Sequence, residues 1–118
     1  MKKKTGFLDQ KTLLSGHQLA CTLIDLGQYD KVKVLALPIL RKLDSTDKYW
    51  SDFRHSYAMA LYRTAGASRD EVIEAVAYFE NVLIPQRRAY GPLHPHTLEV
   101  LAELDRARMI LEDYRSQP

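Results

Sequence analysis

Apolar residues recur at steps of three and four positions along most of the chain, the spacing that gathers side chains on one face of an α-helix. The first such stripe covers residues 11–26, and Asp9 supplies an N-cap side chain just before it. After a break at Gly27, a second stripe covers residues 29–43. The pattern therefore predicts two amphipathic helices that lie antiparallel as close neighbours.

Turn-forming residues divide the rest of the chain into further helical segments. Residues 44–47 supply loop and N-cap chemistry before a third stripe over residues 50–65, which is aromatic on its apolar side. Ser68 and Glu71 form the capping-box pattern, in which each side chain accepts a hydrogen bond from the other residue's backbone N–H. A fourth helix is predicted to begin there and to cover residues 69–90.

Prolines and a glycine mark the bends of the chain. Pro38 falls inside the second helical pattern, where it removes a backbone hydrogen bond, so a kink or bend is predicted there. Gly91 can end the fourth helix in a left-handed cap, Pro92 cannot continue that helix, and Pro95 suits the first turn of a fifth helix. The apolar positions of the fifth helix are Leu98, Leu101, Leu104 and Leu111. No stretch alternates with a period of two, so no strands are predicted.

The segments around Pro38 and Pro85 are similar to each other. When residues 34–43 are aligned with residues 81–90, the prolines coincide, and in both segments a basic pair and a large apolar residue follow. Helix pairs repeated every 34 to 47 residues or so are typical of helical solenoids, in which each unit buries its apolar face on its neighbour. The chain is therefore predicted to use one structural unit twice.

Two groups of residues resemble a known repeat family. The first consists of Leu19, Ala20 and Leu23 with the run 26–32, and the second is the run 91–98. The first group resembles the Leu-Ala core and the Gly-x-Tyr-Asp turn of tetratricopeptide repeats. The second is similar to the Gly-x-x-His-Pro-x-Thr-Leu linker of the longer repeats found in kinesin light chains.

This resemblance spans residues 12–114 and implies an all-α fold. The expected architecture is an α-solenoid of antiparallel helix pairs with about five helices, arranged as two repeats and a terminal capping helix. We expect a flexible N-terminal segment over residues 1–10, one helical domain over residues 11–115 and a tail over residues 116–118.

In tetratricopeptide proteins the first helix of each pair lines a concave groove that receives an extended peptide or a partner's helix. Carried onto the matching helices of this chain, the resemblance implies ten candidate groove residues. They are His17, Cys21, Ile24 and Asp25 from the first helix, Asp52, His55, Met59, Tyr62 and Arg63 from the third, and Arg106 from the fifth. This mixture offers apolar contact together with polar selection.

Composition narrows the classes of function. A chain of 118 residues with 46% hydrophobic and 27% charged residues is typical of one soluble globular domain. The net charge of +2 comes from interspersed signs, which argues against a dedicated nucleic-acid binder. No stretch approaches the roughly 20 apolar residues of a membrane span, and the first residues are too polar for a secretion signal. The predicted location is the cytoplasm.

The residue types that carry chemistry are few. Cys21 is the single cysteine and lies in an apolar helical pattern, which favours a buried structural thiol. His94 and His96 have no cysteine or carboxylate nearby at a metal-ligand spacing, so a structural or solvent-exposed role is predicted for them rather than zinc binding. The chain has no nucleophile elbow, phosphate-binding glycine loop or His-Glu-x-x-His helix. Neither enzymatic activity nor a cofactor is predicted.

We therefore expect a non-catalytic adaptor or scaffold module that binds a protein or peptide partner in its groove, and neither nucleic acid nor membrane. One alternative is a self-assembly or stacking module of a larger complex, because two repeats and a capping helix are short for a free-standing solenoid. Another alternative is a peptide-responsive regulatory domain.

Overall fold

The computed structural model describes residues 9–44 and 46–116 and consists of five α-helices. Most of the predicted N-terminal segment and the end of the predicted tail lie outside these ranges. The helices are α1 (Gln10–Asp25), α2 (Tyr29–Leu40), α3 (Trp50–Arg63), α4 (Arg69–Tyr90) and α5 (Pro95–Ser116). Residues 9–44 and 46–116 contain no strand, and the all-α fold predicted from the periodicity is confirmed.

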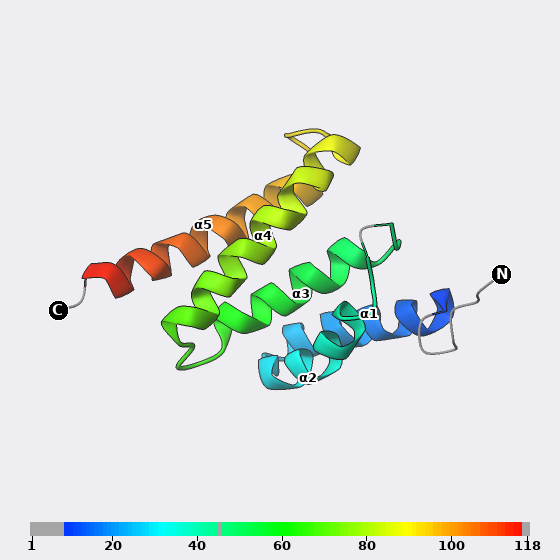
Figure 1. Ribbon diagram of the computed structural model, residues 1–118, viewed down its shortest axis with the longest axis horizontal. Helices are drawn as coiled ribbons and strands as arrows, with labels where there is room; N and C mark the ends of the chain where they lie inside the picture. Colours follow the sequence, from blue (N-terminus) through cyan, green and yellow to red (C-terminus); the bar gives the residue numbers. More distant parts are fainter. Residues whose placement is uncertain (1–8, 45, 117–118) are drawn as a thin grey trace.

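Each helix packs against the next one along the chain, and successive helices reverse direction, as Figure 1 shows for α3, α4 and α5. In addition, α1 contacts α3 and α3 contacts α5. The odd-numbered helices therefore follow one another along one side of the molecule, with α2 and α4 packed behind them. This arrangement is a helical repeat of two pairs and a final helix, and the molecule is elongated, measuring 55 × 31 × 25 Å.

The helix starts follow local hydrogen-bonding chemistry. The Asp9 carboxylate accepts a hydrogen bond from the Thr12 backbone N–H at 2.8 Å, so Asp9 is the predicted N-cap of α1. The capping box of α4 is also confirmed, with Ser68 and Glu71 bonded reciprocally at 2.9 and 3.1 Å. Of the loop and N-cap chemistry predicted for residues 44–47, the N-cap part is wrong, because α3 begins after Tyr49 without a side-chain cap. The Asp44 and Asp47 carboxylates accept hydrogen bonds from backbone N–H groups of their own loop.

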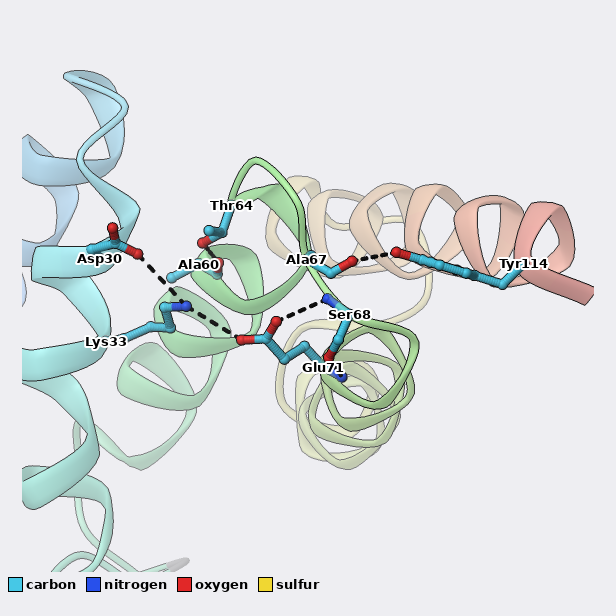
Figure 2. A network of polar contacts seen from close by, with 8 residues as sticks. All are labelled: Asp30, Lys33, Ala60, Thr64, Ala67, Ser68, Glu71 and Tyr114. Atoms are coloured by element: carbon cyan, nitrogen blue, oxygen red, sulfur yellow. Dashed lines mark hydrogen bonds and ion pairs between the residues drawn. The ribbon is translucent and has the colours of Figure 1, made fainter.

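Glu71 also joins the two repeats. Its carboxylate lies 3.4 Å from Nζ of Lys33 on α2, and the same ammonium lies 3.7 Å from the Asp30 carboxylate (Figure 2). On the other side of the α3–α4 turn, the Tyr114 hydroxyl donates a hydrogen bond to the Ala67 carbonyl. The turn is thus tied both to the first repeat and to the last helix.

The two prolines of the internal repeat occupy the second helix of each pair. Pro38 lies in the last turn of α2 and Pro85 lies inside α4. Because α2 ends at Leu40, just after its proline, the second helix is shorter than the predicted stripe of residues 29–43. Leu43 is nevertheless buried in the following turn, which explains why it fits the apolar pattern without being helical.

Gly91 closes α4 with a backbone conformation that favours glycine. Its φ is 88° and its ψ is 162°, and its N–H donates to the Arg87 carbonyl at 2.8 Å. The positive φ agrees with the sequence prediction, but the extended ψ differs from the predicted left-handed cap. His94 then caps α5, since its Nδ1 accepts a hydrogen bond from the His96 N–H at 3.1 Å.

The core runs through all the helices and contains the aromatic side of α3, as predicted, together with Phe79 of α4. Phe53 and Phe79 are fully enclosed, and Tyr57 and Tyr62 are almost so. The His55 and Tyr62 rings both meet the Phe79 ring edge-on, with centroids 5.8 and 5.9 Å away. Such edge-to-face pairs are the favourable geometry for aromatic packing.

The buried face of α5 agrees with the predicted one in part. The helix buries Thr97, Val100, Glu103, Leu104 and Ala107, whereas Leu98, predicted to be apolar-facing, is 44% exposed. Leu104 is buried and Leu101 and Leu111 pack half-buried against the core, so Leu98 is the one predicted leucine that faces away from it. A glutamate occupies the buried side because it has hydrogen-bonding partners there, and hydrophobic periodicity does not detect such a residue.

Candidate functional site

A cavity of about 290 Å³ opens between α1, α3 and α5, and we refer to it as the inner cavity. Three successive odd-numbered helices supply most of its wall, and one residue comes from α4. The lining residues are His17, Cys21, Ile24, Asp25, Asp52, His55, Ser56, Met59, Gln86, His96, Glu99 and Val100. The cavity therefore lies where both helix pairs and the final helix meet.

The α1 side of the inner cavity follows from helical spacing. His17, Cys21 and Ile24 lie four and three residues apart, which places them on one face of the helix. The Cys21 sulfur lies 3.9 Å from Nε2 of His17, and the His17 ring packs 5.9 Å from the Tyr49 ring. Packing against Tyr49 fixes His17 at the edge of the cavity.

Cys21 is exposed, which contradicts the prediction of a buried structural thiol. The reason is that Cys21 lies on the side of α1 that lines the inner cavity. Partial desolvation, together with the carboxylates of Asp25, Asp52 and Glu99, raises the pKa of the Cys21 thiol. A raised pKa disfavours the thiolate, which is the nucleophilic form of cysteine.

The α3 side contributes Asp52, His55, Ser56 and Met59, again at steps of three and four. Nε2 of His55 is buried and has no hydrogen-bond partner in the described part of the chain. Since His55 packs edge-on against Phe79, its ring is held in place from the core side. The His55 ring is therefore held in place while its Nε2 lacks a hydrogen bond among the described residues.

The remaining wall comes from the ends of α4 and α5. Oε1 of Gln86 is buried and likewise lacks a partner among the described residues, while the Gln86 backbone carbonyl accepts a hydrogen bond from the Thr97 hydroxyl at 3.3 Å. That bond joins α4 to the first turn of α5, which carries His96 and Glu99 into the wall. Buried polar atoms are nearly always hydrogen-bonded, so two on one wall need an explanation.

The inner cavity has a negative electrostatic character. Its wall contains the carboxylates of Asp25, Asp52 and Glu99 but no lysine or arginine. Within the ranges that the structure describes, none of these three carboxylates has a hydrogen bond or an ion pair. After burial, all three carboxylates contribute to the raised pKa of the Cys21 thiol, which lines the same cavity.

Seven of the ten candidate groove residues line the inner cavity: His17, Cys21, Ile24, Asp25, Asp52, His55 and Met59. Tyr62, Arg63 and Arg106 do not line it. They surround the buried Glu103 carboxylate, which accepts hydrogen bonds from the Tyr62 hydroxyl, from Nη2 of Arg63 at 2.5 Å and from Nη1 of Arg106 at 3.1 Å. These three residues therefore join α3 to α5 beside the cavity.

Five lining residues were not predicted: Ser56, Gln86, His96, Glu99 and Val100. Ser56 lies four residues after Asp52 and one turn before Met59, so helical spacing on α3 could have found it. His96, Glu99 and Val100 depended on the register of the fifth helix, which the sequence left ambiguous. No sequence signal brings Gln86 to this wall, because α4 lies mostly behind the odd-numbered helices.

The protonation of His55 is controlled from several sides. Burial lowers the pKa of His55 below its usual 6.5, while Glu99, Glu103 and Asp52 oppose this shift and Arg63 adds to it. Because burial outweighs the carboxylates, the folded protein favours the neutral imidazole.

The stability of the protein is consequently expected to fall as the pH drops below about 6.5. There the unfolded chain protonates His55 and the folded protein does not, so the slope is at most about 1.4 kcal/mol per pH unit. Urea unfolding between about pH 7.5 and 5.5, above the titration range of ordinary carboxyls, measures the effect. The His55→Gln variant should show a flatter profile, and an equal slope in both proteins would contradict this account.

The described residues contain no group of three or more histidine, cysteine, aspartate or glutamate side chains arranged to hold a metal ion. None of the helices in residues 9–44 and 46–116 combines the length and the apolar character needed to cross a membrane. Comparisons of the chain with protein-family models, with curated proteins and with solved structures found no match.

Proposed function

We propose that this chain is a non-catalytic, tetratricopeptide-like interaction module that binds a peptide or a partner's helix at the inner cavity, in the cytoplasm. The observation that carries the proposal is the composition of the wall, to which α1, α3 and α5 all contribute. Ligand sites are concave, largely apolar and supplied with a few converging polar groups. The inner cavity is concave, and it combines apolar surface from Ile24, Met59 and Val100 with converging acidic and imidazole side chains.

A peptide is favoured over a larger metabolite by the size and position of the cavity. Its volume of about 290 Å³ is at the lower end for ligand sites, enough for one side chain. The stacking of α1, α3 and α5 along the long axis also leaves helix surface on both sides of the cavity for contact with the rest of a peptide.

Blocking the cavity tests the proposal. Peptides selected from a displayed random library against the parent protein are expected to bind the Cys21→Trp variant at least about tenfold more weakly, which corresponds to about 1.4 kcal/mol. Cys21 is exposed on α1, so an indole there covers the opening without entering the core. Fluorescence anisotropy with labelled peptides measures the affinities.

Gln18→Trp is the matched control, because Gln18 is also exposed on α1 but does not line the cavity. Its affinity for the selected peptides should equal that of the parent. Equal binding by the parent and both variants, or failure to select any peptide, would contradict the proposal.

A specific feature also favours the self-assembly alternative. An almost wholly apolar hollow lies on the outer side of α1 and α2, lined by Leu19, Leu23, Val34 and Leu35 with Asp30 and Lys31 at its rim. Val34 is 76% exposed and Leu19 is 48% exposed. Exposed apolar surface of this kind often marks a protein interface. Light scattering over a range of concentrations separates the two functions, since a strict monomer would contradict self-assembly.

A further inference from the structure

The charge of the inner cavity points to the chemistry of its ligand. Asp25, Asp52 and Glu99 come from three different helices, and they face the cavity without a cationic partner in the described ranges. Elsewhere on α4 and α5, carboxylates such as Glu80 and Glu103 are paired with arginines. Like charges gathered around a partly enclosed space repel one another, so a cation that enters is attracted by all three.

The backbone adds to this negative character. Asp25 is the last residue of α1, and the last turn of α1 contains no basic side chain. The carboxyl end of a helix carries a partial negative charge, which a cation stabilises. The α1 end of the inner cavity therefore presents a carboxylate at the negative end of the helix dipole, although the last carbonyls of the helix accept hydrogen bonds from the backbone N–H groups of residues 26–28.

Two buried polar atoms of the lining residues are a second, independent observation, because each lacks a hydrogen-bond partner in the described part of the chain. Oε1 of Gln86 can only accept hydrogen bonds, and Nε2 of a neutral His55 ring accepts one in one of its two tautomers. Both atoms are buried and unpartnered in the described part of the chain. These two acceptors and the three carboxylates all belong to residues that line the cavity, so the complementary group is rich in donors.

Among the side chains of proteins, the arginine guanidinium matches this wall best. It carries five N–H donors and no acceptor, stays charged at all relevant pH values and bonds two acceptors at once. Its aliphatic stem needs apolar surface, and Ile24, Met59 and Val100 supply it from three helices. Lysine has three donors on a single, strongly hydrated nitrogen, so it can form hydrogen bonds with fewer of these separated acceptors at once.

We propose that the inner cavity is a selectivity pocket for a basic side chain, arginine before lysine, on the peptide that the module binds. This inference rests on the proposed function and names the chemistry of the ligand at the same site. The three carboxylates neutralise the guanidinium, and the Gln86 and His55 acceptors set its orientation.

Nuclear magnetic resonance titration with N-acetyl-arginine methylamide tests the inference at constant ionic strength. Saturable shifts are expected for the backbone amides of Asp25, Asp52 and Glu99 and for the His55 imidazole. The lysine analogue should bind more weakly than the arginine compound. The citrulline analogue has nearly the same shape as the arginine compound but no charge, and it should bind at least about tenfold more weakly.

The double variant Asp52→Asn, Glu99→Gln should weaken binding of the arginine compound by about tenfold or more. The matched control is Asp70→Asn, Asp105→Asn, which removes two charges from exposed positions outside the cavity, one in the first turn of α4 and one on α5. Its affinity should equal that of the parent, and circular dichroism should show both double variants folded.

Three results would overturn the inference: equal binding of the citrulline and arginine compounds, equal losses in both double variants, or no shift at the cavity. The inference and the proposed function can fail separately. If library peptides bind the parent and lose affinity with Cys21→Trp, but tolerate citrulline in place of arginine, the module binds peptides without this selectivity. If no peptide is selected and no shift occurs, both fail.

Discussion

The Phe79→Ala variant is expected to lose about 3–5 kcal/mol of folding free energy, the range for removing a fully buried phenylalanine. Phe79 has no exposed surface and lies on α4, where the His55 and Tyr62 rings of α3 pack against its ring. Truncation to alanine leaves a void that these fixed aromatic rings cannot fill. Small domains have only about 5–15 kcal/mol of stability in total, so the variant should be close to unfolding.

Urea unfolding followed by helical circular dichroism measures this loss. Met109→Ala is a suitable control, because Met109 is 70% exposed on α5 and its truncation should change stability by no more than about 0.5 kcal/mol. A loss below about 1 kcal/mol for Phe79→Ala would show that the contact between α3 and α4 does not depend on this ring.

The Glu103→Ala variant is expected to cost about 3 kcal/mol, because it leaves buried partners without their acceptor. Glu103 is only 5% exposed and bonds the Tyr62 hydroxyl and the Arg63 and Arg106 guanidiniums at once. Removal of the carboxylate leaves the Tyr62 hydroxyl and the Arg63 guanidinium without their acceptor between α3 and α5. We place the loss at the lower end of the range for buried pairs because the Arg63 side chain is 30% exposed.

Glu80→Ala provides the comparison, since Glu80 pairs with Arg108 at 2.8 Å and both side chains are 51% exposed. Exposed pairs contribute at most about 1 kcal/mol, so this variant should be nearly as stable as the parent. If the two substitutions cost the same, burial of Glu103 does not strengthen its role. Raising the salt concentration should affect the Arg108–Glu80 pair more than the Glu103 cluster.

The order of the helices and most of their limits could be predicted from the sequence because local rules determine them. Asp9 and the Ser68–Glu71 box supply hydrogen bonds within one turn of each helix start. Gly27, Gly66 and Gly91 all adopt positive φ at helix ends, where a residue with a side chain is strained. Each of these features involves residues within a few positions of one another, so the sequence alone is enough to predict it.

The face of α5 and the surroundings of Cys21 could not be predicted in the same way. Glu103 is buried because Arg63, forty positions earlier in the chain, reaches it, and no local pattern contains that information. Cys21 belongs to an apolar stripe, yet it is exposed because its side of α1 lines the inner cavity, which helices distant in the sequence form. Both errors come from contacts, present or missing, between units that are distant in the sequence.

The inner cavity lies across the joints of the solenoid, with α3 between α1 and α5 (Figure 1). In a solenoid each unit contacts only its neighbours, so the interfaces between neighbouring units alone resist bending of the molecule. A ligand held by all three helices would act as a brace across two joints. By linkage, a partner whose binding straightens the solenoid would lower the affinity for this ligand, and the ligand would lower the affinity for that partner by the same factor.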